Sequence, residues 1–301
     1  MVYSLGDFGS YWAGGSVARV SEGAPRDIAF TRDASYRYDP RGDFAINAAY
    51  VQYFVPMAAR GAPVVLVHGG GMAGSCWETT PDGRPGWLHR LLDAGRAVHV
   101  VDLPERGRAG FAPAHMPGAP ILRSLQEAWS LFRFGPEDGF DARAAYAAQQ
   151  FPVEALEAFG RRFVPRWLGT APVHLAALLA VLARTGPAVV ICHSQGSETV
   201  FDAAALRPDL VVGLVAVEPS AFPADPATLA TCPPVIVQGD HLDCSDEWRA
   251  RAVRWSELAS AVPGAQLIDT AHAVAPGGSH MLMMDRHSDG VLDAALAALR
   301  V

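Results

Sequence analysis

The sequence predicts an α/β fold, in which a mostly parallel central sheet is covered by helices on both faces. Continuous apolar runs alternate with helical patterns along the chain, as in parallel sheets buried on both sides. Polar residues and glycines follow the ends of these runs, where such sheets place their ligands. One apolar run leads directly into a sharp turn with a serine at its tip, followed by a helical pattern. The chain has 301 residues and is 50% hydrophobic, so it can bury one large core over residues 1–301.

The elements are expected in a regular order. The predicted strands are residues 44–56, 62–67, 97–101, 188–192, 210–217, 234–238 and 265–269. The predicted helices are residues 87–94, 173–184, 197–206, 246–261 and 291–300. Asp246 and Glu247 support a helix start at 246, because negative charge stabilises a helix N-terminus.

Residues 104–172 interrupt this alternation. The segment has no clear buried strand, is rich in aromatic residues and contains a helical pattern at 125–134. An insertion at this point is expected to lie over the carboxyl edge of the sheet as a helical cap. Most of its aromatic residues should pack the cap onto the core, while some line a ligand pocket. The residues expected at the pocket are Trp77, Trp129, Phe132, Trp167 and Met281.

Composition excludes several function classes. The net charge is −7 without a basic cluster, which argues against nucleic-acid binding. No apolar run reaches membrane-spanning length, and residues 1–25 lack a signal-peptide pattern, which leaves a cytoplasmic location or export with the signal already removed. No metal-ligand spacing or dinucleotide fingerprint is present, so we expect no metal and no cofactor. Cys232 and Cys244 flank a predicted strand and are candidates for a disulfide. A homodimer is possible as the oligomeric state.

The stretch VVICHSQGSET at 189–199 carries the strongest chemical signal. A buried strand, a turn with Ser194 at its tip and a helix form the arrangement in which α/β-hydrolases present their nucleophile. The turn needs small neighbours, and Gly196 and Cys192 meet that need. The pattern alone is weak, because a small-x-Ser-x-Gly match arises easily by chance.

A serine nucleophile needs a base and an acid from later in the chain. His280 lies in a glycine-preceded loop between the last strand and the last helix, where the base is expected, and His272 is its rival. Glu218 follows the strand after the nucleophile, whereas Asp240 and Asp243 follow the next strand. The residues alone do not decide between these acids.

An acyl-transfer site also needs two backbone N–H groups that face the developing oxyanion. Gln195, directly after the nucleophile, is expected to supply one. The loop at 68–71, His-Gly-Gly-Gly, follows an earlier strand, and Gly70 is expected to supply the other.

Seven short sequence motifs give the chain a specific resemblance to one group of proteins. They are GSYWAGG at 9–15, WETTPDGRPGW at 77–87, FRFGP at 132–136, WLGTAP at 167–172, HSQ at 193–195, VEP at 217–219 and GSHMLMMDR at 278–286. With them the chain resembles the Alcaligenes-type subfamily of bacterial α/β-hydrolase esterases. The resemblance implies Glu218 as the acid and His280 as the base, with an extra N-terminal segment and a helical cap. The chain departs from the subfamily at Gly70-Gly71, where the best-known form has two adjacent cysteines.

These observations predict a serine carboxylic-ester hydrolase that acts on a small-molecule ester without a cofactor. Lactone or amide hydrolysis, acyl transfer and perhydrolysis use the same three residues and stay open as alternatives. A non-catalytic ligand receptor on the same scaffold is the alternative from a different class.

Overall fold

A central eight-stranded sheet organises the molecule. The structure is a computed structural model that describes residues 2–110, 112 and 118–299. The strands of the sheet lie in the order β1-β4-β6-β5-β7-β8-β9-β10. Their bounds are β1 Leu5–Val20, β4 Gly42–Pro56, β5 Val64–Val67, β6 Val98–Asp102, β7 Ala188–His193, β8 Val211–Val217, β9 Val235–Gln238 and β10 Gln266–Asp269. β1, β4 and β6 pair antiparallel, and β6 through β10 pair parallel. The predicted α/β fold is therefore confirmed.

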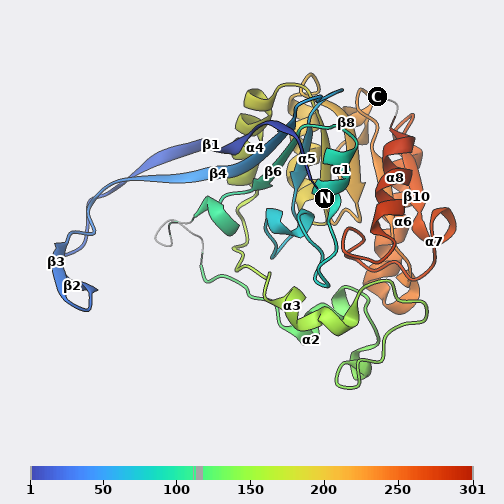
Figure 1. Cartoon of the computed structure of the whole chain (residues 1–301), viewed down its shortest axis with the longest axis horizontal. Helices are drawn as coiled ribbons and strands as arrows, with labels where there is room; N and C mark the ends of the chain where they lie inside the picture. The colour runs from blue at the N-terminus through green and yellow to red at the C-terminus, as the bar shows by residue number, and fades with distance from the viewer. Residues whose placement is uncertain (1, 111, 113–117, 300–301) are drawn as a thin grey trace.

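Helices cover both faces of the sheet (Figure 1). Their bounds are α1 Trp87–Asp93, α2 Leu125–Leu131, α3 Leu156–Gly160, α4 Ala171–Thr185, α5 Gly196–Leu206, α6 Asp246–Ala261, α7 Thr270–Ala273 and α8 Ser288–Ala298. The predicted helix end at residue 300 lies outside the described residues. The Ser245 hydroxyl accepts a hydrogen bond from the Trp248 N–H at 3.3 Å and caps α6.

Two hydrophobic cores follow from the alternation of side chains along each parallel strand. On β5, Val64 and Leu66 pack with α1 and α8, whereas Val65 and Val67 pack with α4, α5 and α6. The strands are apolar on both faces because each face is buried by a helix layer. This double cover fixes the sheet and leaves its edge at the carboxyl ends of the parallel strands free for a site.

A long arm projects from one edge of the sheet. β1 and β4 continue beyond the body as an antiparallel ribbon, which carries β2 (Arg26–Thr31) and β3 (Ala34–Tyr38) at its tip (Figure 1). Phe30 and Tyr36 stack edge to face on the arm and are both exposed. The sequence predicted none of β1, β2 and β3.

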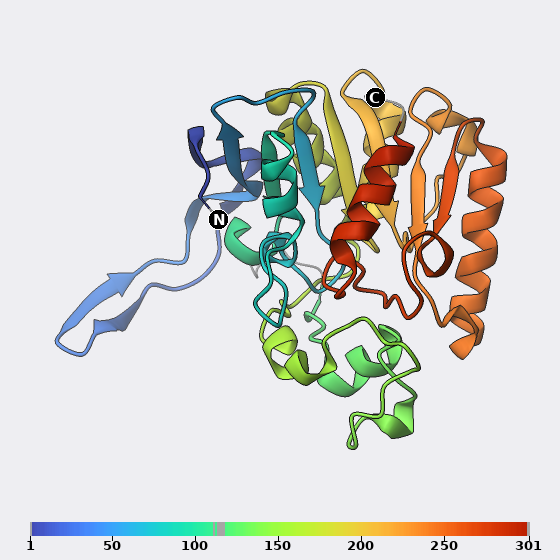
Figure 2. The ribbon, with the colours of Figure 1, turned by 45° about the vertical axis from the view of Figure 1, so that its right-hand side comes forward.

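The segment between β6 and α4 contains α2 and α3 and lies across the edge where the parallel strands end (Figure 2). Its aromatic residues pack closely, with the rings of Phe134 and Phe151 stacked at 3.8 Å between centroids. Trp129 is fully buried and donates a hydrogen bond to the Pro136 carbonyl at 2.8 Å. The aromatic residues thus act mainly as the core of this segment.

The suggested pairing of Cys232 with Cys244 is wrong, because both cysteines are free. They lie at opposite ends of β9, whose four residues span about 13 Å. A disulfide needs Cα atoms less than about 7 Å apart. Within the described ranges, no helix is long and apolar enough to cross a membrane.

Candidate active site

Ser194 lies at the tip of a strained turn between β7 and α5. Its φ angle is +47°, in the left-handed region that only glycine enters easily. The Ser194 N–H donates to the Val217 carbonyl at 3.0 Å, which ties the turn to β8. A Cβ on Gly196 would lie 2.5 Å from the His68 carbonyl oxygen, so this position requires glycine. Strand, turn and helix together hold the serine hydroxyl at the free edge of the sheet.

The structure brings Ser194, His280 and Glu218 into one hydrogen-bonded line. His280 Nε2 lies 3.0 Å from Ser194 Oγ, and His280 Nδ1 lies 2.6 Å from Glu218 Oε2. An ionised carboxylate only accepts hydrogen bonds, so Nδ1 carries the proton and Nε2 accepts from the serine hydroxyl. The imidazole is therefore oriented to remove the proton of Ser194.

Two further groups hold the carboxylate of Glu218. Arg133 donates from Nη1 to Oε2 at 2.9 Å and from Nη2 to Oε1 at 2.5 Å, and Gly239 N–H donates to Oε1 at 2.6 Å. Burial by itself would raise the pKa of Glu218. The charge of Arg133 and the hydrogen bond from His280 outweigh burial and lower this pKa to about 2. Glu218 is thus an anion throughout the neutral pH range.

The loop that carries His280 is braced at both ends. Asp240 Oδ2 accepts from the Gly277 N–H at 2.9 Å, and Asp285 accepts from the N–H and hydroxyl of Ser279, each at 2.7 Å. The His280 N–H donates to the Phe132 carbonyl at 3.0 Å, which connects the loop to the end of α2. Asp240 therefore braces the loop and does not contact the histidine.

The other rival residues lie away from Ser194. The side chain of His272 is 87% exposed and bonds to Asp269 at 2.9 Å. Asp243 lies in a short exposed turn, and its backbone carbonyl accepts from Arg249. Neither His272 nor Asp243 joins the line formed by Ser194, His280 and Glu218.

Burial favours the neutral form of His280. It lowers the pKa of His280 below the usual value, although the hydrogen bond to Glu218 acts in the opposite direction. His193 Nε2 donates to the His280 carbonyl at 2.9 Å, and burial lowers the pKa of His193 well below its usual range. A neutral His280 is the form that can accept a proton.

Two backbone N–H groups beside Ser194 are free to bind an oxyanion. The Leu103 N–H donates to His68 Nε2 at 3.2 Å, so His68 Nδ1 carries the proton and donates to the Gly69 carbonyl at 2.9 Å. In a planar trans peptide the N–H of Gly70 points opposite to that carbonyl. Neither Gly70 N–H nor Gln195 N–H has a hydrogen-bond acceptor among the described residues. His68 thus orients one of the two expected donors.

Ser194 opens into a cavity of about 620 Å³. Phe132 lines this cavity, as predicted, together with charged residues from several elements. The other four predicted pocket residues are absent from its described lining, and Trp77, Trp129 and Met281 are fully buried in the core. Trp167 is also buried and donates to the Gly118 carbonyl at 3.0 Å. These four placements correct the prediction, since Trp129 and Trp167 form hydrogen bonds within the inserted segment and Trp77 and Met281 are buried in the core.

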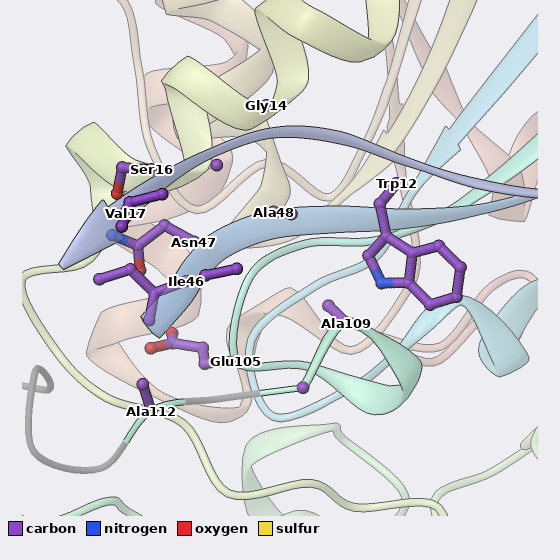
Figure 3. Close-up of a pocket in the computed structure, with 13 residues that line it drawn as sticks. Trp12, Gly14, Ser16, Val17, Ile46, Asn47, Ala48, Glu105, Ala109 and Ala112 are labelled. Atoms are coloured by element: carbon purple, nitrogen blue, oxygen red, sulfur yellow. The ribbon is translucent and has the colours of Figure 1, made fainter. Parts of the chain in front are cut away.

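A second cavity, of about 670 Å³, lies at the root of the arm (Figure 3). Trp12, Asn47 and Glu105 are among the residues around it. Glu105 is the only titratable group in its described lining. The described lining holds no histidine, no cysteine and no second carboxylate that could activate a nucleophile or complete a metal site.

Sequence reasoning missed Arg133 and Arg166. Arg133 follows α2 inside the FRFGP motif and is fully buried. A lone arginine between two phenylalanines needs a buried acid as partner, and this was the available signal. Arg166 precedes the WLGTAP motif, and its Nη1 donates to Gln195 Oε1 at 2.9 Å. Nothing in its local sequence marks it.

Comparisons with known proteins identify the family and the fold. A model of the alpha/beta hydrolase family matches residues 64–264. A solved structure described as a novel bacterial esterase is 29% identical, with a TM-score of 0.87, over 99% of this chain and 96% of that one. A predicted CIB-like hydrolase from Thermoplasma acidophilum has a TM-score of 0.50 at 15% identity, over 94% of this chain and 98% of that one, and shares the fold alone.

A curated relative also matches in sequence. It is a probable secreted lipase from a fungal species (strain ATCC 74256), 30% identical over 220 residues. The match covers 67% of this chain and 57% of the lipase, little more than half the length of that relative.

Proposed function

The chain belongs to the α/β-hydrolase family, and we propose that it is a serine carboxylic-ester hydrolase that works through an acyl-enzyme. The observation that carries the proposal is the relay from Ser194 Oγ to His280 Nε2 at 3.0 Å and from His280 Nδ1 to Glu218 Oε2 at 2.6 Å. The esterase and lipase among its relatives support this reaction class. They do not identify the substrate of this chain.

In the first half of the reaction, Ser194 Oγ forms a bond to the ester carbonyl carbon while its proton passes to His280 Nε2. The carbonyl oxygen becomes an oxyanion, which the N–H groups of Gly70 and Gln195 stabilise. The bond from carbon to the alcohol oxygen then breaks, and His280 gives its proton to the departing alkoxide. Glu218 stabilises the imidazolium while the proton is held.

In the second half, a water molecule attacks the acyl carbon and gives a proton to His280. The bond from carbon to Ser194 Oγ breaks, the proton returns to Ser194, and the carboxylic acid leaves. The residues alone complete the cycle. We also propose that the segment between β6 and α4 acts as a cap over this site, because its Phe132 lines the cavity.

The test combines covalent labelling with turnover. A fluorophosphonate should label Ser194, as located by mass spectrometry of the digested protein, and Ser194→Ala should abolish both labelling and hydrolysis of a p-nitrophenyl ester. Ser256→Ala, on the exposed side of α6, is the matched control and should keep both. An unlabelled Ser194 in folded protein would favour the ligand receptor. A panel of lactones, amides and acyl acceptors would separate hydrolysis from the alternatives.

A further inference from the structure

One arginine beside the nucleophile has no acidic partner. The N–H and carbonyl of Arg166 exchange hydrogen bonds with Ile121 at 3.0 and 2.8 Å, which fixes this part of the inserted segment. Its Nη1 donates to Gln195 Oε1 at 2.9 Å. A Cβ on Gly70 would lie 2.6 Å from the same Nη1. The guanidinium therefore lies against both residues that flank the expected oxyanion position.

The other arginines of the cavity are neutralised. Arg123 pairs with Glu127 at 2.6 Å, and Arg251 pairs with Glu247 at 2.5 Å. In the part of the chain that the structure describes, Arg166 forms no ion pair, and its Nε and Nη2 groups donate to no acceptor. Arg166 is thus the one arginine of the described cavity lining without an ion-pair partner.

The remaining acid of the cavity, Glu198, balances the charge of Arg166 in the formal count, but the two side chains are not paired. Glu198 is exposed on α5 and makes no ion pair with Arg166. Burial lowers the pKa of Arg123, and the nearby charge of Arg166 lowers it further, so the field of Arg166 reaches its neighbours. A cavity with this much charge is a poor site for a long alkyl chain, because ligand pockets for apolar groups are lined mainly by apolar side chains.

We propose that Arg166 binds a carboxylate of the substrate, so that the enzyme prefers esters that carry a second, ionised carboxyl group. The inference rests on the proposed function of Ser194. A guanidinium presents parallel N–H donors that match the two oxygens of a carboxylate. The hydrogen bond to Gln195, which is neutral, positions the guanidinium but does not compensate its positive charge. The Nε and Nη2 groups stay available to donate to a carboxylate.

The kinetic test compares matched esters. One pair places the carboxylate on the acyl side, mono-4-nitrophenyl adipate against 4-nitrophenyl hexanoate. A second pair places it on the alcohol side, 4-acetoxybenzoate against 4-methylphenyl acetate. The quantity measured is the ratio of kcat/KM for the charged ester to kcat/KM for the neutral one.

We expect Arg166→Gln to lower this ratio by about 10- to 100-fold in at least one pair, while kcat/KM for the neutral ester changes much less. Arg166→Lys should keep part of the preference, because lysine keeps the positive charge but lacks the parallel N–H donors of the guanidinium. Glu198→Gln should raise the ratio by removing an opposing charge. Arg161→Gln, an exposed arginine of the same segment, makes the same charge change outside the cavity and should leave the ratio unchanged.

Two results would overturn the proposal. Wild-type protein that turns over the neutral esters without any preference for a charged one would show that Arg166 binds no carboxylate. An equal loss for charged and neutral esters in Arg166→Gln would show that Arg166 only supports Gln195.

A binding measurement separates this proposal from the proposed function. Calorimetry on Ser194→Ala compares monomethyl adipate with methyl hexanoate, neither of which that variant should cleave. Binding of the half-ester that is lost in Ser194→Ala/Arg166→Gln supports the carboxylate site even if the wild-type protein hydrolyses nothing. If the wild-type protein hydrolyses neutral esters but Ser194→Ala binds both probes equally weakly, the proposed esterase function is supported and the carboxylate site is rejected.

Discussion

Arg133 holds both carboxylate oxygens of Glu218 in a pair from which solvent is fully excluded, with contacts of 2.9 and 2.5 Å. The same carboxylate accepts the hydrogen bond from His280 Nδ1. Arg133 also lies over the Trp248 ring, 4.0 Å from its centroid, and donates from Nε to the Asp240 carbonyl at 2.7 Å. One residue of the inserted segment thus connects the acid to β9 and α6.

Removal of Arg133 should harm both stability and turnover. In Arg133→Met the Glu218 carboxylate stays buried without a counter-charge, so we expect a loss of about 3–5 kcal/mol in the free energy of unfolding. The pKa of Glu218 should rise, and kcat should fall because His280 loses its orientation. Urea unfolding and ester hydrolysis measure the two effects.

Arg143→Met is the matched control, because Arg143 pairs with Glu157 where both side chains are partly exposed. That pair should contribute much less to stability than the buried pair, because solvent screens it. An Arg133→Met protein as stable and as active as the wild type would contradict the role assigned to Arg133.

The activity should persist into mildly acidic solution. His280 must be neutral to accept the serine proton, and burial lowers its pKa below the usual 6.5. As the pH falls through the pKa of His280, kcat/KM should fall, with a midpoint below 6.5. In Glu218→Gln the midpoint should move lower still, since the carboxylate that raises this pKa is gone while the charge of Arg133 remains. A wild-type midpoint above 6.5 would contradict this account.

The parallel part of the fold could be predicted because most of its strands, β5 to β9, are buried on both faces. Short apolar runs such as 188–192 and 210–217 are typical of strands buried on both faces, and the small residues around Ser194 indicate the sharp turn. β1 was missed because it is an edge strand with most side chains exposed and several glycines and serines. The arm was missed for the same reason. Few of its side chains are buried, so burial imposes no alternation of apolar and polar residues on its sequence.

The contact between Arg133 and Glu218 could not be predicted from the sequence. Arg133 and Glu218 are 85 positions apart, and only the folded inserted segment brings them together. The choice of Glu218 over Asp240 came from the resemblance, because both acids follow strands that end at the same edge of the sheet. Aromatic side chains were assigned to the pocket by type, yet Phe132 is the one Phe, Tyr or Trp in the described lining, which also holds six charged residues. The homodimer stays a prediction, which light scattering can test.

Glycine at position 196 should be essential for turnover. A methyl group there would lie 2.5 Å from the His68 carbonyl oxygen, which belongs to rigid backbone. The loop with Gly70 or the turn with Ser194 must then shift, and a displacement of about 1 Å costs about 100-fold in rate. We expect Gly196→Ala to lower kcat accordingly. Gly6→Ala serves as the control, because the nearest atom to its Cβ would be the Met57 Cα at 3.4 Å, an ordinary van der Waals contact. Comparable losses in both variants would contradict the prediction.

Asp285 should make the folded protein less stable as the pH rises. Burial raises the pKa of this carboxyl to about 7, although hydrogen bonds from Ser279 act in the opposite direction. In the unfolded chain the pKa of an aspartate is about 3.9, so between these values the folded state binds more protons. The free energy of unfolding should therefore fall by up to about 1.4 kcal/mol per pH unit over that range from this group alone.

Asp285→Asn removes the titration. The stability of the variant minus that of the wild type, measured by urea unfolding, should increase from pH 4 to pH 7 and then level off. Asp202→Asn, an exposed position on α5, should give a difference that does not change with pH. A flat difference for Asp285→Asn would mean that the two hydrogen bonds from Ser279 keep Asp285 ionised, so that the loop carrying His280 is held by a charge and not by a neutral acid.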